Sequence, residues 1–291
     1  MSRYGIGEWY GKPLVDLAVS SRQRLARTAS GNGTPPPCPF QEGAPMCRKA
    51  GGVCSLQQYE EGEDGRIKPP ENPPVIICPA RFEQDRLLIR WLAEIVGLPP
   101  AETMIAREIP FMQSTSTERP AGKIDLVVGR VGNDELRWYA LEIQAVYFSG
   151  PGMSSQFELL RNDTGPLPPY PDRVRRPDWR SSSAKRLMPQ LQVKAPTVRR
   201  WQTKIAVAVD RPFFESIGGP SLNASQDIND GDVIWLVPEL TRDEPNGSYR
   251  LAHGHWEVLT LEAATEKLLA ARTISRNDFE TTLREKLLPL T

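Results

Sequence analysis

The stretch that decides the fold runs from Lys123 to Val146 and reads KIDLVVGRVGNDELRWYALEIQAV. It holds two runs rich in β-branched and aromatic residues, Lys123–Val131 and Glu135–Val146. Between them, Val131-Gly132-Asn133-Asp134 is typical of a turn. The stretch therefore predicts a β-hairpin.

The expected faces of this hairpin follow from the alternation of side chains along a strand. If the loop has an even number of residues, Asp125 lies opposite Ala140 and shares its face with Glu142 and Gln144. The other face then carries the apolar side chains of both strands: Ile124, Leu126, Val128, Leu141, Ile143 and Ala145. One face is thus expected to be apolar, and the other gathers two carboxylates and an amide.

Two carboxylates at cross-strand distance repel each other unless a cation or a proton lies between them. Mg²⁺ is the simplest such cation, because it is a hard ion that prefers oxygen ligands. The alternative is that Asp125 and Glu142 are ordinary solvent-facing strand residues, since alternation places polar groups outside in any case.

Charge is distributed unevenly in this chain of 291 residues, whose net charge is zero. Its 39% hydrophobic and 25% charged residues are typical of a globular protein of one large or two small domains. Residues 161–211 hold twelve Lys and Arg against four Asp and Glu, which gives +8. Such a segment suits a surface that faces a polyanion, although a solvated arginine-rich loop would have the same composition. The candidates for DNA contact are Arg173, Arg175, Arg176, Arg180, Lys185 and Arg186.

All four cysteines, Cys38, Cys47, Cys54 and Cys78, lie within residues 38–78. The chain begins without the charged and apolar runs of a signal peptide and has no apolar run of membrane-spanning length, so we expect a cytoplasmic protein. Disulfides are rare in a reducing compartment, and thiols clustered in a Gly- and Pro-rich segment suit a tetrahedral metal site. Iron and zinc both accept four thiolates, and two disulfides or free thiols are the remaining alternatives.

Other elements follow from periodicity. Arg81 to Val96 has the apolar stripe of a helix, Ser182 to Trp201 is expected to be helical with a break near Pro196, and Thr203 to Asp210 is expected to be a buried strand. Residues 149–181 are expected to form a long loop. Further strands are expected at 104–111, 233–236 and 249–260, and helices from Thr260 and from the cap at Ser275.

The order helix, three strands, helix and strand over residues 81–210 resembles the core of the PD-(D/E)xK nucleases. With the cysteine segment upstream and Glu-x-Gln in place of Glu-x-Lys, the chain resembles the NotI family of type II restriction endonucleases. That resemblance implies an α/β fold, with a mixed sheet flanked by helices and an N-terminal module whose four cysteines hold iron. It also implies that Asp125, Glu142 and Gln144 are catalytic. Ile124 stands where the superfamily often has proline.

The same resemblance assigns roles to single residues. Asp125, Glu142 and the backbone carbonyl of Ile143 would bind Mg²⁺, and Gln144 would orient the attacking water. Glu108 best matches an additional upstream carboxylate, with Glu94 and Glu102 as alternatives. Gln144 lacks the charge of a lysine, so that charge is expected from a second metal held partly by Glu108 or from an arginine of the cationic segment.

We therefore expect a Mg²⁺-dependent endonuclease that acts as a homodimer on double-stranded DNA, at a palindrome that the resemblance makes GC-rich. A repair or structure-specific nuclease and a non-catalytic, metal-bearing DNA-binding protein are the alternatives. The expected organisation is an arm and linker (1–37), a four-cysteine module (38–80), the catalytic core (81–215), and strands and helices packed on that core (216–291).

Overall fold

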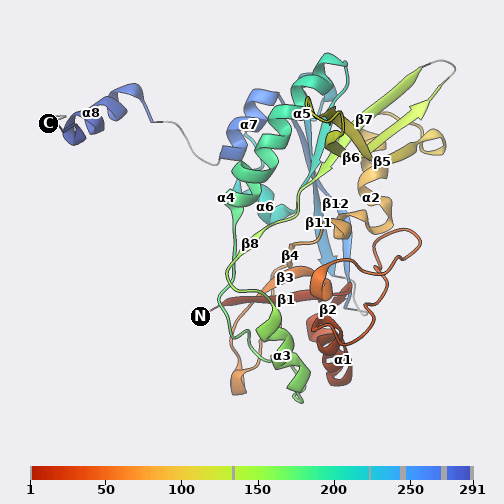
Figure 1. Ribbon diagram of the computed structural model, residues 1–291, viewed down its shortest axis with the longest axis vertical. Helices are drawn as coiled ribbons and strands as arrows, with labels where there is room; N and C mark the ends of the chain where they lie inside the picture. Colours follow the sequence, from red (N-terminus) through yellow and green to blue (C-terminus); the bar gives the residue numbers. More distant parts are fainter. Residues whose placement is uncertain (1, 133–134, 223, 243–246, 270–273, 289–291) are drawn as a thin grey trace.

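A mixed six-stranded sheet forms the centre of the computed structural model, which describes residues 2–132, 135–222, 224–242, 247–269 and 274–288 (Figure 1). The strand order is β12-β11-β10-β7-β6-β5. The three strands β5, β6 and β7 pair antiparallel, β7, β10 and β11 pair parallel, and β12 is antiparallel to β11. The bounds are β5 (Met104–Gln113), β6 (Pro120–Val131), β7 (Leu136–Ile143), β10 (Ile205–Ala208), β11 (Val233–Arg242) and β12 (Tyr249–Leu259).

Helices cover both faces of this sheet, as expected for an α/β fold (Figure 1). On one face, α2 (Leu87–Ile95) packs its apolar stripe against β6, β7, β10 and β11. On the other face lie α5 (Met188–Arg200), α6 (Arg211–Ser216) and α7 (Leu261–Leu269). The strand β10 is completely buried between the two layers, which explains its run of small and β-branched residues.

The first 37 residues do not form an arm. β1 (Arg3–Trp9) pairs antiparallel with β3 (Val53–Tyr59) in a second sheet of order β2-β1-β3-β4. This sheet joins the N-terminus to the cysteine segment, so the two expected modules share one core. The sequence did not predict β1, because Gly5 and Gly7 lie within it and glycine is unfavourable in strands. In the fold, a Cβ at Gly5 would collide with Gln156 and Pro171. The short strands are β2 (Lys12–Pro13) and β4 (Val75–Ile76).

The segment 149–181 is not simply a loop. It contains α3 (Ser154–Asn162), which packs beside α1 (Val19–Ala29) and buries Phe157 and Leu160. A small ribbon of β8 (Phe148–Ser149) and β9 (Arg176–Pro177) follows the hairpin of β6 and β7. The 3-10 turns are Leu14–Asp16, Ala50–Gly52, Glu63–Gly65, Pro79–Arg86, Pro100–Glu102 and Ile228–Asp230.

The helix predicted over Ser182–Trp201 has no break near Pro196; its irregular turn lies at Ser183–Leu187 instead. α4 (Trp179–Ser182) runs through one π-helical turn, Ser183–Leu187, into α5. α5 continues past Pro196, because proline leaves only the Gln192 carbonyl without its helical partner, and Gln192 is exposed to water. The last helix, α8 (Arg276–Lys286), stands apart from the body (Figure 1), and Ser275 caps it by accepting from the Asp278 N–H at 3.1 Å.

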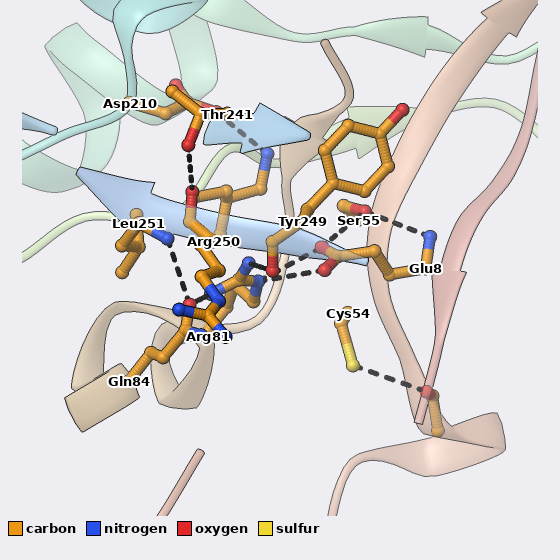
Figure 2. Close-up of polar contacts among 12 residues, drawn as sticks. Glu8, Cys54, Ser55, Arg81, Gln84, Asp210, Thr241, Tyr249, Arg250 and Leu251 are labelled. Carbon is orange, nitrogen blue, oxygen red and sulfur yellow. Dashed lines mark hydrogen bonds and ion pairs between the residues drawn. The ribbon is translucent and has the colours of Figure 1, made fainter. Parts of the chain in front are cut away.

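A buried ion pair connects the N-terminal sheet to the central sheet (Figure 2). Arg81 Nε donates to both carboxylate oxygens of Glu8 at 3.0 Å, and its Nη2 donates to the Tyr249 carbonyl at 3.0 Å. Ser55 Oγ donates to the same carboxylate at 2.9 Å. Neither charged side chain is exposed. A buried ion pair needs such hydrogen bonds, because both charges have lost their contact with water.

Candidate active site

The register of the hairpin brings the two acidic residues closer than the sequence predicted. Val131 pairs with Leu136, and Leu126 pairs with Leu141, so Asp125 lies level with Glu142. The expected pairing of Asp125 with Ala140 is wrong by two residues. The turn residues 133 and 134 lie outside the described residues. A shift of two residues is one full period of a strand, so it leaves Asp125 on the same side of the hairpin as Glu142.

Asp125 lies where β6 separates from β7. Its Oδ2 accepts a hydrogen bond of 3.0 Å from the backbone N–H of Ile143, in place of a strand-to-strand backbone bond. Ile124 packs in the core beneath α5 with Val146, whereas Leu126 packs beneath α2. The prediction that Ile124 shares a face with Leu126 is therefore wrong; the pairing of β6 with β7 begins only at Leu126, so Ile124 lies beyond the paired part of the hairpin.

Glu142 is almost completely buried, with 2% of its surface exposed. Its Oε2 accepts a hydrogen bond of 2.7 Å from Lys194 Nζ on α5, and its Oε1 has no partner. Burial, and then the nearby charge of Asp125, raise the pKa of Glu142 to about 7, although Lys194 acts in the opposite direction. The face of the hairpin that carries Glu142 is thus not a solvated polar face, because α5 covers it.

Gln144 follows β7 directly, and its backbone N–H donates to the Ala208 carbonyl at 3.0 Å. Its side-chain Nε2 donates to the Ala145 carbonyl at 2.5 Å. The amide is half-buried beside Ile143, whose own N–H is bound by Asp125. Three of the predicted catalytic residues therefore belong to one short segment and its neighbouring strand.

Glu108 lies on β5 between the pairs Arg107–Leu126 and Ile109–Ile124, which places its backbone level with Asp125. Its backbone is left-handed, with φ of 50°. The exposed carboxylate accepts from Lys123 Nζ at 2.8 Å, and this hydrogen bond lowers the pKa of Glu108. Its alternative Glu102 is ion-paired with Arg130, and Glu94 is exposed on α2.

Helix α4 is held against the residues that follow β7. The Tyr147 N–H donates to Ser182 Oγ at 2.8 Å, and the Tyr147 carbonyl accepts from the Asp178 N–H at 2.8 Å. The guanidinium of Arg186 stacks on the exposed Tyr147 ring, 4.5 Å from its centroid. Of the six predicted DNA contacts, four are exposed and pair with no carboxylate in the described ranges: Arg176, Arg180, Lys185 and Arg186.

Two members of the predicted set differ from these four. Arg173 is exposed but ion-paired with Asp172 at 3.3 Å. Arg175 is only 3% exposed, and its guanidinium donates to the carbonyls of Pro151 and Gly152. Arg175 therefore holds the chain just before β9 against the segment between β8 and α3, and we omit it from the candidate DNA surface.

The four cysteines are free thiols in one region beside β3 and the start of the Pro79–Arg86 turn. Burial raises the pKa of Cys47, Cys54 and Cys78. A cavity of about 630 Å³ is lined by Cys38, Cys47 and Cys78 together with Arg48, Lys49 and Arg107. Across the described ranges, no three His, Cys, Asp or Glu side chains lie close enough together to hold a metal ion, so the structural metal stays a prediction.

Lys194 is the residue that sequence reasoning did not find as part of the site. It lies 52 residues after Glu142, in a helix whose packing the sequence does not specify. Its place among the buried residues of α5, beside Leu191, Ala195 and Val198, was the available signal, because a lysine on an apolar helical face needs a partner.

The donor set at Asp125 and Glu142 fits a hard cation. Glu142 Oε1 is a buried carboxylate oxygen without a hydrogen-bond donor, and the Asp125 carboxylate beside it is exposed. An oxygen ligand of this kind is what Mg²⁺ requires.

Comparison with known proteins identifies the family of the chain. No helix in the described residues is long and apolar enough to cross a membrane. A search of curated proteins found no match. The family model described as restriction endonuclease NotI matches residues 20–251, which include the cysteine segment, the hairpin of β6 and β7, and the helices α4 and α5. The chain therefore belongs to the NotI family of type II restriction endonucleases.

Proposed function

We propose that the protein hydrolyses both strands of DNA at a specific palindrome, with Mg²⁺ held by Asp125 and Glu142. The observation that carries the proposal is the pairing of these carboxylates at the end of the hairpin, with Glu142 Oε1 buried and free of donors. A buried carboxylate oxygen is costly without a partner, so a bound cation stabilises the site.

The proposed roles follow from chemistry. Asp125, Glu142 and the Ile143 carbonyl would hold the ion, which lowers the pKa of bound water and stabilises charge on the phosphate. Gln144 would orient the attacking water by turning its amide away from the Ala145 carbonyl. Glu108, level with Asp125 on the next strand, would contribute to a second cation site after releasing Lys123.

We also propose that the enzyme acts inside the cell as a homodimer, since two-fold protein symmetry matches a palindrome, and that a GC-rich target fits the family. Arg186, whose guanidinium lies over the Tyr147 ring, and the exposed Arg176, Arg180 and Lys185 would contact DNA. The thiols of Cys38, Cys47, Cys54 and Cys78 would hold iron or zinc, which would stabilise the N-terminal sheet.

Digestion of a sequenced phage genome with the purified protein and Mg²⁺, followed by mapping of the ends, tests this function. We expect one short palindrome at every end, and no ends in the presence of a chelator. Ends without a common sequence, or cleavage of branched substrates alone, would favour a repair nuclease. Specific binding without any ends would favour a non-catalytic protein.

A further inference from the structure

The nuclease centre contains one buried cation, and it comes from a helix. Lys194 is 6% exposed, and its Nζ is 2.7 Å from Glu142 Oε2. Gln190 Oε1, one turn earlier on α5, accepts a second hydrogen bond from the same ammonium group at 3.2 Å. Two acceptors thus fix the ammonium position on a helix that packs against the catalytic strand.

The charge of the site shows why this lysine is needed. Asp125 and Glu142 together carry −2 when ionised, and Gln144 is neutral. Asp125, Glu142 and Lys194 together contribute −1, so one divalent cation bound by them gives a net charge of +1. Without Lys194 the loaded centre would be neutral and would attract a phosphodiester less strongly.

We propose that Lys194 is the positioning residue of this centre, and that it supplies from α5 the fixed positive charge that Gln144 does not supply from the strand. It holds Glu142 Oε2 and leaves Oε1 free for the cation. The charge expected from a second metal or from an arginine of the loop is then already present inside the protein. This inference rests on the proposed nuclease function.

A purely structural role for Lys194 makes a different prediction. If the lysine only neutralises a buried carboxylate, Mg²⁺ replaces it in the loaded enzyme, and its charge becomes dispensable. If the lysine also supplies charge to the reaction, its removal frees Glu142 for Mg²⁺ but slows cleavage. Tighter Mg²⁺ binding together with slower cleavage therefore indicates that the lysine supplies charge to the reaction. Unchanged cleavage at saturating Mg²⁺ indicates a purely structural role.

The experiment compares wild type, Lys194→Met, Gln144→Lys and the double variant that carries both changes. Mg²⁺ affinity is measured by calorimetry, and single-turnover cleavage is measured at saturating Mg²⁺. For Lys194→Met we expect Mg²⁺ to bind roughly tenfold tighter, because a like charge a few ångströms away is lost. We expect cleavage to slow by about 100- to 1,000-fold, the usual effect of losing one electrostatic contribution.

The double variant returns a lysine to the same site from the strand, so it should cleave faster than Lys194→Met. Arg200→Met, an exposed change at the end of α5, is the matched control and should leave both quantities unchanged. Wild-type cleavage by Lys194→Met at saturating Mg²⁺ would overturn the inference and leave the nuclease function intact. If Lys194→Met does not fold, a folded double variant that binds Mg²⁺ without cleaving would also overturn it. Absence of both Mg²⁺ binding and cleavage in wild type would instead remove the proposed function.

Discussion

The Asp125 carboxylate accepts a hydrogen bond of 3.0 Å from the backbone N–H of Ile143, the residue that follows Glu142. This bond fixes the distance between the two acidic strands at the point where β6 leaves β7. Asp125→Asn keeps the shape of the side chain but removes its charge. We expect cleavage to fall by at least about 1,000-fold, as when an essential catalytic group is lost.

DNA affinity separates this effect from misfolding. Asp125→Asn removes a negative charge facing phosphates, so binding without Mg²⁺ should be unchanged or tighter. A gel-shift titration and a cleavage assay on the same preparation check both. Normal cleavage by Asp125→Asn would contradict the assignment of the active site.

Metal binding should depend on pH because the pKa of Glu142 is raised from 4.5 to about 7. Below pH 7 the folded protein holds a proton there, and this proton must leave before the ion binds. We expect the Mg²⁺ affinity to increase about tenfold per pH unit up to pH 7 and then level off. Calorimetry at pH 5.5, 6.5 and 7.5 measures this, and an affinity that is flat across the range would show that Glu142 is already ionised.

The same group affects stability without metal. Its pKa is higher in the folded state than in the unfolded chain, so the folded state binds the proton more tightly. The contribution to the free energy of unfolding is therefore largest below pH 4.5 and is lost as pH rises to 7. Glu142→Gln should remove this part of the pH dependence in denaturation experiments.

The Arg81–Glu8 ion pair should matter more for folding than any surface pair. Arg81→Met leaves the Glu8 carboxylate buried with only Ser55 as a side-chain donor, which should cost about 3–5 kcal/mol of unfolding free energy. Adding Glu8→Gln should recover part of the loss. Urea denaturation measures it, with the exposed Arg90→Met as control. A loss below about 1 kcal/mol would mean that the pair behaves like an exposed one.

Local periodicity predicted much of the fold. Leu88, Trp91 and Leu92 of α2 lie on the buried side, and β10 is buried as its composition indicated. The hairpin formed with the expected strands, but its register depended on the geometry of the turn. β1 was missed because its glycines are needed for close packing, which only tertiary structure reveals.

The sequence predicted only those residues of the candidate site that belong to the hairpin of β6 and β7. Asp125, Glu142 and Gln144 are neighbours in a local pattern, so alternation grouped them. Lys194 joins the site through the packing of α5, and Tyr147 is held by Ser182 of α4; both positions depend on contacts between distant segments. The composition of its segment predicted that Arg175 lies on the DNA-binding surface. Its guanidinium instead donates to two backbone carbonyls of the segment before α3.

The cysteine segment should hold one transition metal per chain. Cys54 is 5% exposed on β3, so Cys54→Ser removes one thiolate without adding bulk. We expect the metal to be lost and the N-terminal sheet to be destabilised, because metal binding contributes to folding. Elemental analysis checks the metal content, and thiolate-to-iron absorbance would distinguish iron from zinc. Two disulfides in the mass spectrum, or no metal in the wild type, would contradict this prediction.

The exposed cations of residues 176–186 should carry DNA affinity. Single alanine substitutions at Arg176, Arg180, Lys185 and Arg186 remove side chains without a described carboxylate partner, so their charge is available for phosphate. Each lost phosphate contact should reduce the slope of log K against log salt by about 0.9. A residue that reads guanine should instead cost about 1–3 kcal/mol on cognate DNA and little on scrambled DNA.

Arg186 is the strongest of these candidates. Its guanidinium carbon lies over the ring of Tyr147, 4.5 Å from the centroid, and Tyr147 follows Gln144 by three residues. A guanidinium can donate two parallel hydrogen bonds to one phosphate. Arg186→Lys keeps the charge but loses the planar fork, so it should weaken cognate binding while preserving the salt slope. Arg161→Ala is the control, because Arg161 pairs with Glu158 on α3. If at least two of the four alanine variants weaken binding, this surface contacts DNA. If all four match Arg161→Ala across the salt series, the DNA surface lies elsewhere, and the cavity lined by Arg48, Lys49 and Arg107 becomes the next candidate.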